Sequence, residues 1–179
     1  MKKMMMFAAA LVVAVAAQAA SIDWSVAANS WTMSDGSKPA TGTSVYLIDM
    51  AQLASIESAI ENGATSFKAG DDGIIAVGTT SNTKGYVAKS TATSDKLVAG
   101  KEYDFAYLVF DGEQYFVSAS SKLAAYDLND PVYKEPNAIA FDSNSYANSS
   151  SKWQATPEPT SALLLVLGGA LLALRRKRA

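Results

Sequence analysis

Residues 102–118 read EYDFAYLVFDGEQYFVS, two apolar runs on either side of Asp111-Gly112. Asp-Gly is a favoured two-residue turn between strands, so the pattern predicts a β-hairpin. Successive side chains of a strand point to opposite faces, and both faces of this hairpin are aromatic or branched. One face carries Ala106, Leu108, Phe110, Tyr115 and Val117, and the other carries Phe105, Tyr107, Val109 and Phe116. A longer loop, Asp-Gly-Glu-Gln, shifts the pairing by two positions and keeps both faces. We therefore expect a central hairpin that is covered on both sides.

Short apolar runs separated by Ser, Thr, Asn and Gly recur on both sides of this hairpin. The pattern is typical of a mainly β domain, and we expect an antiparallel, β-sandwich-like arrangement over residues 20–141. The expected strands are Asp23–Ala28, Ser44–Ile48, Gly73–Val77, Gly85–Lys89, Glu102–Phe110, Gln114–Ser118 and Ala138–Phe141.

One amphipathic helix is expected near residues 50–62. Asp49 followed by Gln52 resembles a capping box, and Asn62-Gly63 supplies a stop. Between them, Leu53, Ile56 and Ile60 fall on one face at helical spacing. We expect this face to cover one surface of the sheet.

The domain between the two ends of the chain is acidic. Residues 20–154 hold nine Lys against sixteen Asp and Glu, a net charge of −7. This charge makes nucleic acid an unfavourable partner, and we expect none. The 179-residue chain has no cysteine, so its exported part relies on a single apolar core without disulfides.

Residues suited to catalysis or metal binding are few. The chain has no His and no Cys, which excludes Ser-His-Asp and Cys-His nucleophiles and His/Cys metal sites. Asp127, Asn129 and Asp130 lack the spacing and terminal Glu of a calcium loop, so they predict a turn before Pro131. The Gly-rich residues 69–73 lack a P-loop lysine pattern and also predict a turn. We therefore predict no enzyme activity, no catalytic residue, no metal and no cofactor.

Two carbohydrate-related hypotheses stay open. Sixteen acids offer many carboxylate pairs for glycoside hydrolysis, although no spacing singles one out; two carboxylates roughly 5–10 Å apart in one cleft, one of them desolvated, would support an enzyme. Six aromatic residues are candidates for a sugar-stacking platform, although core or sheet positions are favoured because Tyr and Trp are ordinary strand residues. They are Trp24, Trp31, Tyr103, Tyr107, Tyr115 and Tyr126.

The N-terminus has the pattern of a secretory signal peptide. Lys2 and Lys3 precede an apolar stretch, which ends in the A-x-A sequence Ala17-Gln18-Ala19. These are a charged n-region, a short h-region and a cleavage site. We expect residues 1–19 to direct the chain to the Sec export machinery and to be removed after Ala19.

The C-terminal tail, residues 156–179, has three parts in fixed order. They are Pro157-Glu158-Pro159, an apolar run at 162–174, and the basic residues Arg175, Arg176, Lys177 and Arg178. The two prolines favour an extended backbone. The run has seven leucines and a valine, but thirteen helical residues reach only about 20 Å across a hydrocarbon core of about 30 Å. We expect a marginal transmembrane helix over residues 161–174, with the basic cluster as a cytoplasmic membrane stop.

These three parts resemble the PEP-CTERM sorting signal of exported bacterial proteins. The resemblance covers residues 156–179 alone. It implies that an exosortase, a membrane-embedded transpeptidase-like cysteine protease, recognises Pro157-Glu158-Pro159 and cleaves the tail. Such systems accompany exopolysaccharide production in Gram-negative bacteria. The alternative from the residues alone is an ordinary tail anchor that is never processed.

Together these features predict an exported surface or extracellular-matrix protein that acts by binding or by structural presence. It is held briefly in the inner membrane, sorted through its tail and then placed at the cell surface or in the matrix, with exopolysaccharide as a candidate partner. Residues 142–155, rich in Ser and Asn, are expected to link the domain to the tail. Trp153 is a candidate for docking back on the domain. The alternative function is an exported carbohydrate-active enzyme with a carboxylate pair.

Overall fold

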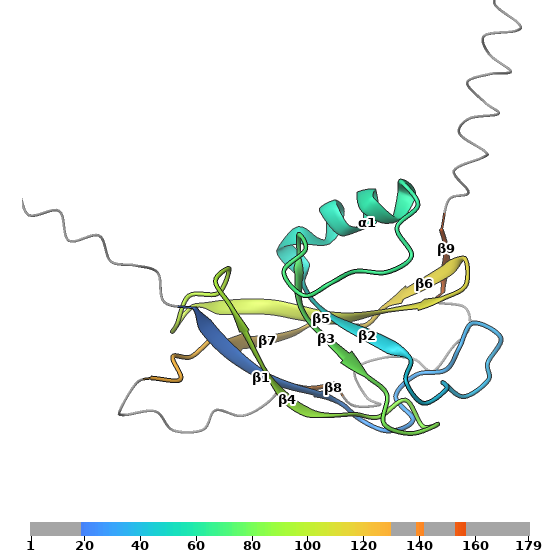
Figure 1. Ribbon diagram of the computed structural model, residues 1–179, viewed down its shortest axis with the longest axis horizontal. Helices are drawn as coiled ribbons and strands as arrows, with labels where there is room; N and C mark the ends of the chain where they lie inside the picture. Colours follow the sequence, from blue (N-terminus) through green and yellow to red (C-terminus); the bar gives the residue numbers. More distant parts are fainter. Residues whose placement is uncertain (1–18, 130–138, 142–152, 157–179) are drawn as a thin grey trace, which may run out of the picture.

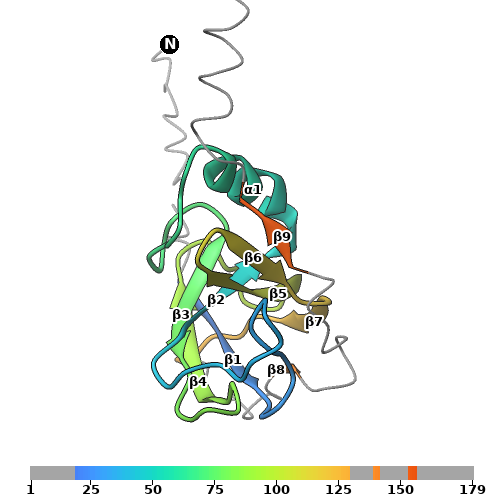
Figure 2. The same ribbon diagram turned by 90° about the vertical axis from the view of Figure 1, so that its right-hand side faces the viewer.

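The computed structural model describes residues 19–129, 139–141 and 153–156 (Figures 1 and 2). These residues form two β-sheets and one helix, as the sequence predicts. In chain order the elements are β1 (Ala20–Val26), β2 (Ser44–Asp49), the 3₁₀ turn η1 (Met50–Gln52), α1 (Leu53–Glu61), β3 (Ile74–Thr79), β4 (Val87–Ser94), β5 (Glu102–Asp111), β6 (Gln114–Val117), β7 (Ser121–Ala124), β8 (Ile139–Phe141) and β9 (Gln154–Ala155).

Strand β5 lies at the centre of the larger sheet, whose order is β3-β2-β5-β6-β9 with β7 also paired to β5. The β5–β6 hairpin has the register of the longer of the two predicted loops, because Phe110 lies opposite Tyr115 and Asp111 opposite Gln114. Beyond the hairpin, β2 pairs with residues 105–109 in the middle of β5, and β7 pairs with residues 102–105 at its start. The predicted central position is confirmed.

The two faces of β5 belong to two different cores, with the residues that the alternation predicts. Against the helix lie Ala106, Leu108 and Tyr115, packed with Ile56 and Ile60 of α1. Phe105, Tyr107, Val109 and Phe116 lie in the other core, which holds side chains of β1 and β4 as well. The larger sheet is therefore covered by the helix on one face and by the smaller sheet on the other (Figure 1).

The smaller sheet has the order β4-β1-β8. Strands β1 and β4 are antiparallel, with Ala20 opposite Ser94. Strand β8 runs parallel to β1, so the prediction of antiparallel pairing is wrong at this edge. A parallel pair needs a long crossover connection, and here nearly the whole domain separates the two strands in sequence. That separation removes the constraint a tight hairpin turn would impose on strand direction.

The helix forms where it is predicted and ends at the predicted glycine. The Asp49 carboxylate accepts a hydrogen bond of 3.0 Å from the Ala51 amide and so caps the 3₁₀ turn that precedes α1. Gly63 has φ +94° and donates its N–H to the Ile60 carbonyl, and the next residue donates to Ala59. These bonds form a Schellman motif, which satisfies carbonyls left open at the helix end. The helix buries Ile56 and Ile60, each 1 % exposed, against the sheet.

Several strand bounds differ from the prediction, and two strands are new. Strand β1 begins at Ala20 rather than Asp23, and β4 continues through the polar residues KSTATS to Ser94. Strands β7 and β9 have four and two residues. Such short, polar segments have no readable alternation, because their pairing depends on a neighbouring edge rather than on their own side chains.

Candidate functional site

Most of the predicted sorting residues lie outside the described part of the chain. This applies to Ala17, to Pro157-Glu158-Pro159, to the basic residues 175–178 and to the predicted transmembrane helix at 161–174. Ala19 is exposed and directly precedes β1. Within the described ranges, no helix combines the length and the hydrophobicity that a membrane crossing needs.

The residues just before the sorting motif are held on the domain. Trp153–Thr156, here called the C-terminal segment, contains β9, which pairs with the outer edge of β6. Figures 1 and 2 both show β9 beside β6 at the end of the hairpin. The last three residues of the predicted 142–155 linker are thus attached to the domain, whereas residues 142–152 lie outside the described ranges.

Contacts along the C-terminal segment fix it from both ends. At its start, the half-buried Trp153 ring packs against the core between the sheets, with its centroid 5.8 Å from the Phe116 ring centroid, and Nε1 donates to the Thr32 carbonyl over 3.1 Å. In its middle, the Tyr115 hydroxyl donates to Gln154 Oε1 over 2.6 Å. At its end, Thr156 donates both its N–H (2.6 Å) and its hydroxyl (2.7 Å) to the Glu113 carbonyl. The predicted option that Trp153 docks back is confirmed.

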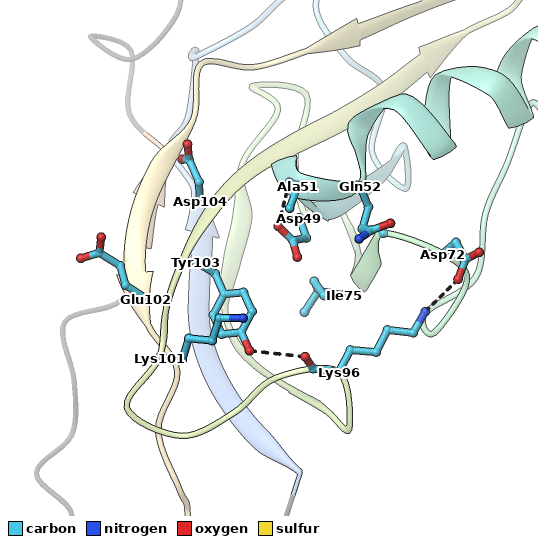
Figure 3. Close-up of a pocket in the computed structure, with 11 residues that line it drawn as sticks. Asp49, Ala51, Gln52, Asp72, Ile75, Lys96, Lys101, Glu102, Tyr103 and Asp104 are labelled. Atoms are coloured by element: carbon cyan, nitrogen blue, oxygen red, sulfur yellow. Dashed lines mark hydrogen bonds and ion pairs between the residues drawn. The ribbon is translucent and has the colours of Figure 1, made fainter. Parts of the chain in front are cut away.

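A cavity of about 490 Å³ lies where β2 ends and the helical segment begins (Figure 3). Strand β2 follows β5 only as far as the pair Asp49–Phe105, and then the chain turns away into η1. The first residues of β5 continue with β7 on their other side, so the departure of β2 opens the space. The cavity is lined by Asp49, Ala51, Gln52, Asp72, Gly73, Ile75, Lys96, Lys101, Glu102, Tyr103 and Asp104.

Most charged and polar groups in this cavity are engaged within the protein. Asp49 caps the helical segment, as described above. Lys96 Nζ donates to the carbonyls of Gly70 and Asp71 and lies 3.5 Å from an Asp72 carboxylate oxygen. Lys101 Nζ lies 4.9 Å above the Tyr103 ring centroid, and the Tyr103 hydroxyl accepts a hydrogen bond from the Val98 amide. These contacts hold the loops around the cavity together.

The four acids that line the cavity are divided between the two sides of β5. Residues opposite each other in an antiparallel pair share a face, so Asp49 lies on the same face as Phe105. Alternation then places Glu102 and Asp104 on the other face of β5. Figure 3 agrees, with these two acids on one side of the β5 ribbon and Asp49 and Asp72 on the other. One Asp104 oxygen is buried with no hydrogen-bond partner among the described residues.

The aromatic residues proposed as a sugar platform belong mainly to the core. Trp24, Trp31, Tyr107 and Tyr115 are buried, and Tyr103 and Tyr126 are half-buried. The favoured core interpretation is confirmed. The predicted turn at Asp127 also forms, since its carboxylate accepts a hydrogen bond of 2.8 Å from the Asn129 amide. Asp130 lies outside the described residues, and the described residues contain no cluster of three acids with metal-binding geometry.

A buried carboxylate in β1 is the polar feature that the sequence did not reveal. Asp23 is 3 % exposed and accepts hydrogen bonds from Thr91 Oγ1 (2.6 Å) and the Tyr126 hydroxyl (2.7 Å), with Lys89 Nζ at 3.3 Å. Burial alone raises the pKa of Asp23, but the three hydrogen bonds and the charge of Lys89 outweigh it and lower the pKa below its ordinary 3.8. The network therefore favours a charged Asp23 that joins β1 to β4 and to the segment after β7.

Comparison of the chain with protein-family models, with curated proteins and with solved structures finds no match.

Proposed function

We propose that this chain is an exported bacterial surface or matrix protein that is sorted through its C-terminal tail. The observation that carries the proposal is the fixed order of Pro157-Glu158-Pro159, the apolar run 162–174 and the basic residues 175–178. By its resemblance to PEP-CTERM signals, this tail is the substrate of an exosortase. Until it is cut, the apolar run holds the protein in the inner membrane with the basic cluster in the cytoplasm.

Contacts at the two ends of the described domain fit this proposal. Strand β1 begins at Ala20, directly after the predicted signal-peptide cleavage at Ala19, and Thr156, the residue before Pro157, is hydrogen-bonded to the domain. Between these points the two sheets share one apolar core, and the finer description that we propose for this domain is a β-sandwich.

The exported domain acts, in this proposal, by binding or by structural presence rather than by catalysis. The acids that line the cavity lie on two sides of β5. Most of the charged groups in the cavity bind other groups of the protein. The domain's net charge of −7 disfavours nucleic acid. Exopolysaccharide is the partner class that the sorting system implies.

Intact-mass analysis of the protein from separate fractions of its native cells tests both ends at once. We expect mature material to begin at Ala20 and to end at or near Pro157-Glu158-Pro159, in the surface or matrix fraction. Native material that still ends in Arg-Arg-Lys-Arg-Ala would show an ordinary tail anchor instead.

A fusion protein tests whether the tail is sufficient for sorting without the exported domain. Residues 142–179 joined to an unrelated exported domain should be processed in a host with the matching exosortase, because every recognisable sorting feature lies in the tail. A fusion that stays uncut, while the native protein is cut in the same host, would show that the domain supplies part of the recognition.

A further inference from the structure

The C-terminal segment ends immediately before the sorting motif. Thr156 makes two hydrogen bonds to the Glu113 carbonyl at the tip of the β5–β6 hairpin, and Pro157 is the next residue. Upstream of Thr156, β9 pairs with β6, and Trp153 packs against the core and donates a hydrogen bond to the Thr32 carbonyl. The docked residues are therefore those that directly precede the sorting motif in the chain.

Docking limits access to the motif in two ways. A cleft that binds an extended peptide needs the backbone groups and side chains of that peptide. In the docked segment, β9 already uses one backbone edge on β6, and the half-buried Trp153 packs against the core. Docking also shortens the connection. The last motif residue, Pro159, lies three residues beyond Thr156, a reach of about 10 Å, whereas release of the four docked residues extends the connection to seven residues and a reach of about 23 Å.

We propose that the C-terminal segment is a latch that controls cleavage of the tail. Docked on β6, it withholds the residues before Pro157 from the sorting enzyme; released, it gives that enzyme an extended chain at a distance from the domain. Gln154, Trp153 and Thr156 are then positioning residues for processing, because they determine the fraction of time for which the motif is available. This inference rests on the proposed sorting through the tail.

A disulfide across the latch tests the proposal in the full chain. Gln114 and Ala155 are opposite each other in the β6–β9 register, and both are exposed. Opposite residues of an antiparallel pair have Cα separations of about 4.5–5.5 Å, within the range of a disulfide. The chain has no cysteine of its own, so Gln114→Cys with Ala155→Cys introduces the only pair. Export exposes that pair to an oxidising compartment.

A matched control uses the pair Ser44→Cys with Thr79→Cys. These residues are also opposite each other in an antiparallel pair and exposed, but they join β2 to β3 at the other end of the larger sheet. Both double variants and the native chain are expressed in a host with the matching exosortase. Thiol titration reports disulfide formation, and intact mass reports tail cleavage.

We expect both disulfides to form, and cleavage to fall at least tenfold in the latch variant alone and to recover when a reductant is added. Failure of the latch disulfide beside a formed control disulfide would show that the segment is not docked. A formed latch disulfide with unchanged cleavage would show that docking does not control processing. If neither the native chain nor the control is cut, the proposed sorting through the tail is wrong. Thiol titration of the latch variant still shows in that case whether the segment docks on β6.

A release variant gives the opposite change. Trp153→Ala removes the ring contact with Phe116 and the hydrogen bond to Thr32, so initial cleavage should be several-fold faster than in the native chain. Trp153→Phe retains an aromatic ring, so its initial cleavage rate should lie between the rates of the native chain and of Trp153→Ala. Leu128→Ala, at an exposed side chain, is the control and should cleave at the native rate. Slower cleavage in Trp153→Ala would contradict the latch.

Discussion

Gly73 lies against the helix, and replacing it with alanine tests how the helix is seated. The residue precedes β3, has φ +76°, and its carbonyl accepts a hydrogen bond from the Asp49 amide. A methyl group added there would meet Gln52 Cβ and Ile56 Cδ1, each at 2.8 Å. Real Cβ atoms essentially never come that close, so part of the helical segment has to move. Gly63, at the helix end, has φ +94° with nothing within 4 Å of such a methyl group.

Alanine substitutions at the two glycines therefore distinguish two costs: Gly63→Ala introduces backbone strain alone, and Gly73→Ala introduces backbone strain and steric overlap. Holding a non-glycine residue in the left-handed region costs about 1–2 kcal/mol, which is the loss of unfolding free energy expected for Gly63→Ala. Gly73→Ala carries the same strain plus an overpacking cost of about 1–3 kcal/mol, for a total of about 2–5 kcal/mol. The Ile56 methyl group can rotate aside, but Gln52 Cβ is fixed to the backbone, which keeps the second contribution large.

Urea unfolding of residues 20–156, followed by circular dichroism and tryptophan fluorescence, measures both losses. The m-value should stay unchanged, since each substitution strains the native state and leaves the surface exposed on unfolding almost the same. Equal losses for the two variants, or a smaller loss for Gly73→Ala, would refute the close contact between Gly73 and the helical segment.

Three further predictions concern the buried charge and the tail. Because the pKa of Asp23 is lowered in the folded state, its stabilisation is complete above the unfolded pKa near 3.8 and is lost as the pH falls through the folded pKa. Asp23→Asn should cost about 1–3 kcal/mol at pH 7 and remove that part of the acid dependence; an unchanged acid unfolding curve would contradict this. Neutral residues in place of Arg175–Arg178 should remove the membrane stop, so that uncut chain appears outside the inner membrane in cell fractionation. Alanine at Pro157 and Pro159 should leave membrane insertion intact but slow cleavage, measured by C-terminal peptide mass, because the segment then joins the helix; cleavage at the native rate would contradict this reasoning.

The central hairpin and the helix were predictable because their signals are local. Side chains that alternate along β5 and β6 have to separate into two faces, and both faces are apolar, so a covered central position follows whatever the loop length. In the same way, the helix signals are local: Asp49 at its start, the four-residue spacing of Ile56 and Ile60, and Gly63 at its end all lie within one helix length. Neither prediction required knowledge of what lies across the sheet.

The sequence by itself also determined the acidic charge of the domain, the absence of His and Cys chemistry, and the patterns of its two ends. Only the tertiary structure decided the parallel direction of β8, the burial of Asp23 and the docking of Trp153–Thr156 on β6. Each of these depends on partners far away in sequence: Thr91 and Tyr126 for Asp23, and Phe116 and Thr32 for Trp153. A two-residue strand is too short to show a periodicity of its own. A polar side chain in a strand is predicted to be exposed from the sequence, because the distant segment that covers it cannot be identified there. Such pairings require a free strand edge or a hydrogen-bond partner from a distant segment. Folding of the rest of the domain brings that edge or partner into place.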